Sequence, residues 1–144
     1  MIGTVIRSLT MEDADGASLL VTELGYLTHK EEMSGRLAGL LSDPCYAAFV
    51  AERGGSLVGL AGGRIGRYFE ENGLYAQLVV FVVTASAHRT GVGTALLHAV
   101  EHWATAKGAR EIIVNSGNHR DDAHLFYEAR GFRATGLRFK KSLA

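Results

Sequence analysis

Hydrophobic residues recur along this chain with two different periods, and each period predicts its own kind of element. Short runs rich in branched and apolar residues predict strands at residues 5–9, 46–51, 57–65, 74–84, 111–115, 132–134 and 137–141. Spacings of three and four residues predict amphipathic helices after Thr10 and at residues 31–41, 91–107 and 121–130. The resulting order, βααβββαβαββ, predicts an α/β (α+β) fold with about four helices on a mixed, mostly antiparallel sheet of six to seven strands.

Two details of the strand pattern bear on what the sheet does. The run VVFVV at residues 79–83, within the strand predicted at 74–84, predicts burial on both faces of the sheet. The strand predicted at 57–65 contains Gly59, Gly62 and Gly63. Glycines inside a strand indicate a bulge or a close approach of another backbone.

Composition and charge narrow the class of protein. The 144 residues, 47% apolar and 21% charged, suit a single globular domain over residues 1–144 and exclude a disordered chain. The 15 basic residues balance the 15 acidic ones, so neither a nucleic acid nor a membrane surface is an expected partner. One cysteine, Cys45, excludes an intrachain disulfide. Glycine is frequent, at 18 residues against one proline, which indicates backbone that must approach something closely.

The N-terminal segment does not have the pattern of a targeting signal. The first twenty residues include Glu12, Asp13 and Asp15 and lack a basic start followed by an apolar core. The longest strongly apolar run, residues 78–83, is far shorter than the ~20 residues that cross a bilayer. These features predict a cytoplasmic protein.

The most informative segment joins the apolar strand to the helix predicted at 91–107. Its loop, residues 88–93, reads HRTGVG and opens that helix. The first turn of a helix has unpaired N–H groups and a partial charge of about +0.5, and glycines there let an anion approach. The loop therefore predicts a phosphate or pyrophosphate site, although a tight turn without a ligand would also suit these residues. A dinucleotide fingerprint is excluded because Leu96 stands where its third glycine is needed.

A second signal lies in residues 120–132, RDDAHLFYEARGF. Ala123, Phe126, Tyr127 and Arg130 fall on one face of the predicted helix. A phenol with a pKa near 10 can donate a proton to a leaving thiolate, whose pKa is about 8.5. Tyr127 would equally serve as a core aromatic residue whose hydroxyl is satisfied by a neighbour.

Together and in this order, the two signals resemble the GNAT superfamily of acyl-CoA-dependent N-acetyltransferases. HRTGVGTALL follows a valine-rich strand, and AHLFYEARGF follows later in the chain. The resemblance covers residues 57–143. The run RDDAHLFYEARGFRATGLRFKKSL is also similar to that of bacterial aminoalkylphosphonate N-acetyltransferases and related small-amine acetyltransferases.

The resemblance implies a GNAT-like fold with acetyl-CoA as cosubstrate. The strand at 78–84 would splay from the strand at 111–115 and hold the pantetheine arm in the gap, while the 89–93 loop would cradle the pyrophosphate. The residues so assigned to acetyl-CoA are Phe81, Val82, Val83, His88, Arg89, Thr90, Gly91, Val92, Gly93, Thr94, Asn115 and Arg120. A backbone N–H of the splayed strand would stabilise the oxyanion, and Tyr127 falls at the position of the general acid.

The chain departs from the family pattern in three places. His88 stands where the family loop usually begins with Gln or Arg, and Arg120 stands where many members have Asn. Arg120 would pair with a CoA phosphate or an acidic substrate, or would simply be solvated. Residues 78–83 lack the base Glu of some members, yet an alkylammonium must lose a proton before it attacks. Candidates for the base are Glu70, Glu71, His29, His124 and a water chain.

The resulting hypothesis is a small-molecule amine N-acetyltransferase that works by direct attack. The alternatives are a protein or peptide N-acetyltransferase, a non-catalytic acyl-CoA-binding sensor and a binding domain for another phosphorylated ligand. The acceptor pocket is expected beside the two N-terminal helices and the 68–73 loop, and a homodimer is expected from the family. No metal site is expected, because His98 and His102 have the spacing of a metal pair but Ala99 stands where a zincin has Glu.

Overall fold

The computed structural model describes residues 3–115 and 121–144. It divides into two compact units, residues 1–113 and 114–144, and each is described by itself. No helix among the described residues is long and apolar enough to cross a membrane.

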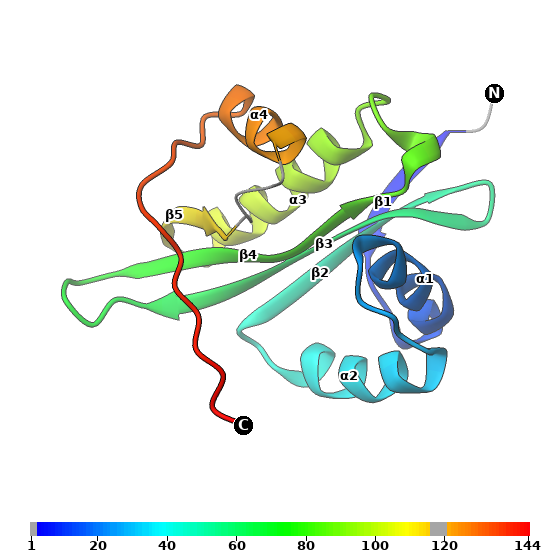
Figure 1. The fold of residues 1–144 in the computed structure, drawn as a ribbon, viewed down its shortest axis with the longest axis horizontal. Helices are drawn as coiled ribbons and strands as arrows, with labels where there is room; N and C mark the ends of the chain where they lie inside the picture. Colours follow the sequence, from blue (N-terminus) through cyan, green and yellow to red (C-terminus); the bar gives the residue numbers. More distant parts are fainter. Residues whose placement is uncertain (1–2, 116–120) are drawn as a thin grey trace. The chain divides into compact units, whose positions relative to one another are not determined.

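The described residues form one sheet of five strands in the order β1-β2-β3-β4-β5 (Figure 1). The strands are β1 (Thr4–Ser8), β2 (Tyr46–Arg53), β3 (Ser56–Arg67), β4 (Leu74–Val83) and β5 (Ala109–Val114). The first four pair in antiparallel fashion with their sequence neighbours. A helix connects β4 to β5, which is the crossover that parallel neighbours require, so the sheet is mixed as predicted.

Helices cover both faces of this sheet. They are α1 (Ala14–Leu24), α2 (Lys30–Ser42) and α3 (Val92–Ala106), and 3-10 turns η1 (Met11–Asp13) and η2 (Ala85–Ala87) precede α1 and α3. The second unit contains α4 (Asp121–Ala129). Figure 1 shows α1 and α2 on one face and α3 on the other. Residues of β3 point alternately to the two faces of the sheet. Leu60 packs in the core beneath α1 and α2, whereas Gly59 and Gly63 lie against α3.

Packing explains why β3 is rich in glycine. A Cβ at Gly59 would lie 2.6 Å from the Leu96 side chain of α3, and a Cβ at Gly63 would lie 2.8 Å from the Trp103 ring. Leu96 itself is completely buried. The glycines therefore let α3 pack directly on the sheet, which holds the start of that helix rigidly in place.

The prediction of six to seven strands is wrong at the C-terminal end of the chain. Residues 132–144 form neither a helix nor a strand, so the expected strands at 132–134 and 137–141 are not formed. The side chains of Leu137, Phe139 and Leu143 are 76%, 87% and 94% exposed. Alternation of apolar and basic residues makes a segment compatible with a strand, but a strand also needs a neighbour that buries one of its faces.

The prediction that residues 79–83 are buried on both faces is also wrong. Leu78 and Val82 are buried, but Val79 is 43% exposed. The predicted bulge is present, because the β3–β4 pairing shifts between Gly62 and Gly63. The shift in pairing and the exposed Val79 occur at the same point of β4.

Candidate active site

The segment between β4 and α3 passes twice through left-handed backbone. Arg89 has φ 61°, and Gly91, the N-cap of α3, has φ 86°. A Cβ at Gly91 would meet no atom within 4 Å, so its backbone dihedral and not crowding calls for glycine. The predicted loop and helix start are confirmed, since α3 begins at Val92.

The start of α3 is open to an anion. No side chain caps this helix, and its first turn contains no acidic residue. Gly91, Val92, Gly93 and Thr94, all predicted to bind acetyl-CoA, form the N-cap and the first turn. The N–H groups and the positive end of the helix dipole at this point are the ordinary requirements of a phosphate site.

Two predicted site residues shape the loop through their side chains. The Nε2 atom of His88 lies 2.7 Å from the carbonyl oxygen of Val83, to which an Nε2–H group donates. The hydroxyl of Thr90 donates to the carbonyl oxygen of Ala87 at 2.5 Å. The first bond ties the loop to the end of β4 and the second closes a turn within the loop, so both side chains stabilise its shape.

Glu23 of α1 is a loop-holding residue that sequence reasoning missed. Its carboxylate accepts hydrogen bonds from the Thr84 hydroxyl at 2.6 Å and from the Ala85 N–H at 2.9 Å. These contacts anchor the start of the loop to α1, which lies on the face of the sheet opposite to α3 (Figure 1). The partners lie more than sixty residues apart in the chain, and no local pattern connects them.

Two arginines lie at or beside the loop. Arg89 is exposed at its tip and makes no ion pair with the residues that the structure describes. Arg53, at the end of β2, donates to the Thr4 hydroxyl at 2.8 Å and reaches the Thr90 hydroxyl at 3.5 Å. Arg53 was not among the predicted site residues, because only the fold brings the end of β2 to this loop.

The end of β4 leads into the loop. Phe81, Val82 and Val83 pair with residues 59–61 of β3 along one edge, and β5 lies along the other edge. Val82 is buried, whereas Phe81 and Val83 are half-buried. The gap expected between β4 and β5 would therefore place a ligand against the backbone of residues 81–83.

A β-bulge interrupts β4 just before this segment. Gly62 pairs with Val80 and Gly63 pairs with Leu78, so Val79 has no partner residue on β3. Bulges release backbone groups from the ladder and redirect side chains, and they are frequent beside active sites. Here the bulge turns both Val79 and Val80 toward one cavity.

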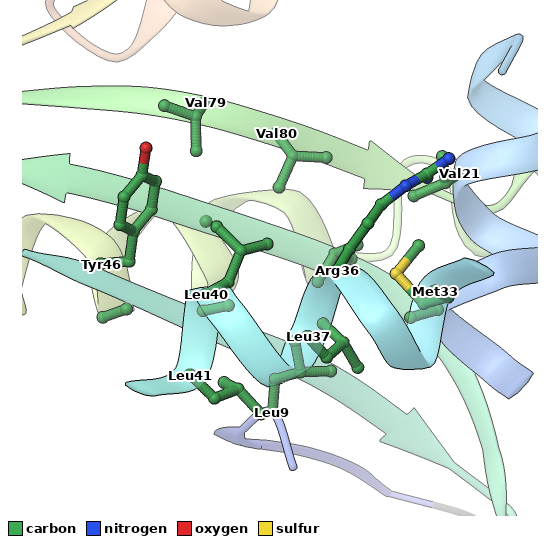
Figure 2. A pocket seen from close by; sticks show the side chains of 15 residues that line it. Leu9, Val21, Met33, Arg36, Leu37, Leu40, Leu41, Tyr46, Val79 and Val80 are labelled. Atoms are coloured by element: carbon green, nitrogen blue, oxygen red, sulfur yellow. The ribbon is translucent and has the colours of Figure 1, made fainter. Parts of the chain in front are cut away.

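That cavity lies between α1, α2 and strands β2–β4 and has a volume of about 170 Å³. Figure 2 shows its apolar lining, with Arg36 reaching from α2 toward Val21 and the Tyr46 hydroxyl lying on the other side near Val79. The cavity lies beside the two N-terminal helices, where an acceptor pocket is expected. The 68–73 loop does not line it.

The remaining predicted residues belong to the second unit or lie outside the description. Asn115 follows β5 and is exposed, and Arg120 lies outside the described residues. Tyr127 is half-buried on α4, with its ring 5.6 Å from the Phe126 ring and 5.4 Å from the Phe132 ring, centroid to centroid. The aromatic neighbours pack against the Tyr127 ring.

The candidate bases lie on different segments of the chain or are already engaged by other residues. The guanidinium of Arg110 pairs with Glu71, so that carboxylate is already engaged. Glu70 and Glu71 lie in the loop that precedes β4, at the opposite end of this strand from Val83 and the loop that leads to α3. His29 is the N-cap of α2, with a capping box that joins it to Glu32, and His124 is half-buried on α4.

Known proteins resemble this chain in sequence and in fold. The sequence model described as "Acetyltransferase (GNAT) family" matches residues 15–132. An aminoglycoside N(6')-acetyltransferase of Klebsiella aerogenes is 36% identical over 104 residues, which cover 67% of each chain. An aminoalkylphosphonate N-acetyltransferase of Salmonella typhimurium is 29% identical over 140 residues, which cover 96% of this chain and 90% of that one.

The fold is found in solved structures as well. An aminoglycoside N-acetyltransferase in complex with CoA superposes with a TM-score of 0.85 at 21% identity, covering 100% of this chain and 97% of the other. At that identity the similarity concerns the fold alone. It agrees with the element order described above.

Proposed function

The chain belongs to the GNAT family of acetyltransferases and transfers acetyl groups to amines, and on that premise we propose three finer assignments. Acetyl-CoA is the donor, a small-molecule primary amine is the acceptor, and the amine attacks the thioester directly. A single acetyltransferase domain spanning residues 1–144 carries out the reaction, which the family match across both units supports.

The observation that carries the donor assignment is the uncapped start of α3 behind Gly91. A diphosphate placed there accepts N–H bonds from the first turn and lies at the positive end of the helix dipole. Arg89 and Arg53 add positive charge on two sides of the loop. Two phosphates can thus be held without a metal ion, because backbone and guanidinium donors both form charge-assisted bonds.

The bulge in β4 supports the position proposed for the thioester. A pantetheine arm that runs back from the loop along residues 81–83 brings the thioester close to Val79. The backbone there is outside the β3 ladder, so we assign the oxyanion-stabilising N–H to this bulge. A donor fixed in a sheet needs no reorganisation when the charge develops, which is the condition for effective oxyanion stabilisation.

The proposed chemistry balances in one addition and one elimination. The neutral amine nitrogen forms a bond to the thioester carbon, the C–S bond then breaks, and the thiolate takes the phenolic proton of Tyr127. Solvent returns a proton to the phenolate. The ammonium proton leaves through water, because the described stretch of residues 78–83 contains no carboxylate and Glu71 is engaged by Arg110.

The volume of the cavity favours a small acceptor over a protein segment. A space of about 170 Å³ is similar to engineered cavities that hold one benzene molecule. A cytoplasmic setting and a homodimer complete the proposal. The exposed free thiol of Cys45 fits a reducing compartment, and sedimentation tests the dimer.

Thiol release from acetyl-CoA in the presence of a panel of amines, with mass detection of the acetylated product, tests the function. Tyr127→Phe is expected to lower kcat about 100-fold, as loss of a general acid does, with little change in the KM for acetyl-CoA. Tyr68→Phe is the matched control, since it removes a phenol that donates to Glu111 at 2.7 Å on the surface. An unchanged kcat in Tyr127→Phe would show that Tyr127 is not the acid, and binding of acetyl-CoA without turnover would favour a sensor.

A further inference from the structure

We propose that Arg36 makes the acceptor cavity selective for amines that carry an oxyanion on a short apolar body, and selective against polycationic amines. The inference rests on the function proposed above, because it takes the cavity beside Val79 as the acceptor site. It distinguishes between the two substrate classes of the relatives, aminoglycosides and aminoalkylphosphonates, on the chemistry of this chain.

The lining of the cavity is unsuited to a polycation. Among the described residues that line it, none is acidic, and the side chains are apolar apart from Arg36 and Tyr46. An ammonium group removed from water needs a partner of opposite charge or several hydrogen bonds. An acceptor with several ammonium groups would leave most of them uncompensated here and would also be repelled by Arg36.

Arg36 is oriented at the cavity by one hydrogen bond, and its other guanidinium N–H groups remain available to a ligand. Its Nη1 donates to the Thr28 hydroxyl at 3.1 Å, and that hydroxyl in turn donates to the carbonyl oxygen of Tyr26 at 2.8 Å. Thr28 is 5% exposed, so the anchor is buried and fixed. One of the five guanidinium N–H groups is thereby oriented, and the planar fork remains able to bind an oxyanion in bidentate fashion.

The charge of Arg36 is uncompensated in the described part of the chain. Arg7 pairs with Asp13 and Glu52, and Arg110 pairs with Glu71, whereas no described carboxylate lies within ion-pair distance of Arg36. Arg36 is itself exposed, so water solvates its charge, and an anionic ligand would replace this water with charge-assisted hydrogen bonds.

The geometry of the sheet places the amine end of such an acceptor correctly. Val79 and Val80 line the cavity, and they precede the proposed pantetheine segment at Phe81 by roughly 3–7 Å of strand. An acceptor whose oxyanion is bound by Arg36 would extend its apolar body along Leu37 and Leu40 toward β4 (Figure 2). Its amine would then emerge at the bulge.

Matched acceptors and matched variants test the assignment. Aminoethylphosphonate, β-alanine and propylamine share a short apolar body but differ in the anionic group, and kanamycin supplies a polycation. Arg36→Gln removes the guanidinium charge. Lys30→Gln removes a charge from the same helix at an exposed position outside the cavity. Binding of each amine is measured in the presence of CoA, and kcat/KM is measured with acetyl-CoA.

Arg36→Gln is expected to weaken binding and kcat/KM for aminoethylphosphonate and β-alanine about 10- to 100-fold, the usual effect of a lost charge-assisted bond. Values for propylamine and the KM for acetyl-CoA should change less than about 2-fold, and Lys30→Gln should resemble the wild type. An equal loss for propylamine, or a wild-type preference for kanamycin, overturns the inference. Arg36-dependent binding of the phosphonate without acetylation of any amine supports it while contradicting the proposed function.

Discussion

Replacement of Gly91 by Ala tests whether the start of α3 binds acetyl-CoA. The substitution adds a methyl group that meets no atom within 4 Å, but it forces an L-residue to adopt φ 86°. Left-handed backbone costs an L-residue ~1–2 kcal/mol, and part of this is offset because Ala lowers the entropy of the unfolded chain. The expected loss of stability is therefore about 1 kcal/mol, or ~2–4 °C in Tm for a chain near this length.

Gly108, just beyond the other end of α3, provides the matched control. It has φ 88° and equally open space around a Cβ, so Gly108→Ala should cost the same ~1 kcal/mol. The loop at Gly91 would relax away from its left-handed geometry and misalign at least one N–H from the diphosphate. One charge-assisted bond corresponds to a rise of roughly 10-fold or more in the Kd for acetyl-CoA.

Calorimetric titration of the folded proteins with acetyl-CoA, alongside thermal unfolding, separates the two effects. The expected result is a similar fall in Tm for both variants and a weaker Kd only for Gly91→Ala. If Gly91→Ala loses stability yet binds acetyl-CoA like the wild type, the diphosphate is not held at this helix. Equal weakening by Gly108→Ala would mean that general strain in α3 explains the effect.

Three further substitutions test the packing and the electrostatics of the fold. Gly63→Ala would place a Cβ 2.8 Å from the Trp103 ring and should destabilise the protein by ~1–3 kcal/mol. Gly39→Ala, in an open position on α2, should instead stabilise it by ~0.5–1 kcal/mol. Urea unfolding measures both changes in the free energy of unfolding, and the same sign for both would contradict the reasoning. Hydrogen bonds from Arg7, at 2.8 Å, lower the pKa of Asp13, so the stabilisation is complete above the ordinary carboxyl pKa of ~3.9 and is lost as the pH falls below it. Asp13→Asn should cost ~2 kcal/mol at neutral pH and flatten that acid dependence, and an unchanged pH profile would refute the role of the pair.

Local chemistry explains which parts of the site could be predicted. The apolar run of β4, the glycines of the loop and the amphipathic pattern of α3 are adjacent in the chain, so their geometry follows from dihedral preferences and helix-end electrostatics. The same holds for the bulge, because Gly62 and Gly63 weaken β3 where β4 carries the extra residue.

The errors at the C-terminal end have a different cause. Leu137 and Phe139 alternate with basic residues, as strand residues do, yet this segment is exposed and unpaired in the described structure. Strand propensity expresses packing against neighbours more than any intrinsic preference of the backbone. A pattern with period two is therefore a condition for a strand and does not by itself produce one.

By itself, the sequence determined the order strand–loop–helix that begins at β4, since the apolar run, the glycine at the helix start and the hydrogen bonds of His88 and Thr90 all lie within a few residues of one another. Only the tertiary structure brought Glu23 to Thr84, Arg53 to Thr90 and Arg36 to the cavity beside Val79. Each of these contacts joins elements that are far apart in the chain. Such contacts depend on how helices and strands pack, and a linear pattern of residue types does not give the distance in space between two elements.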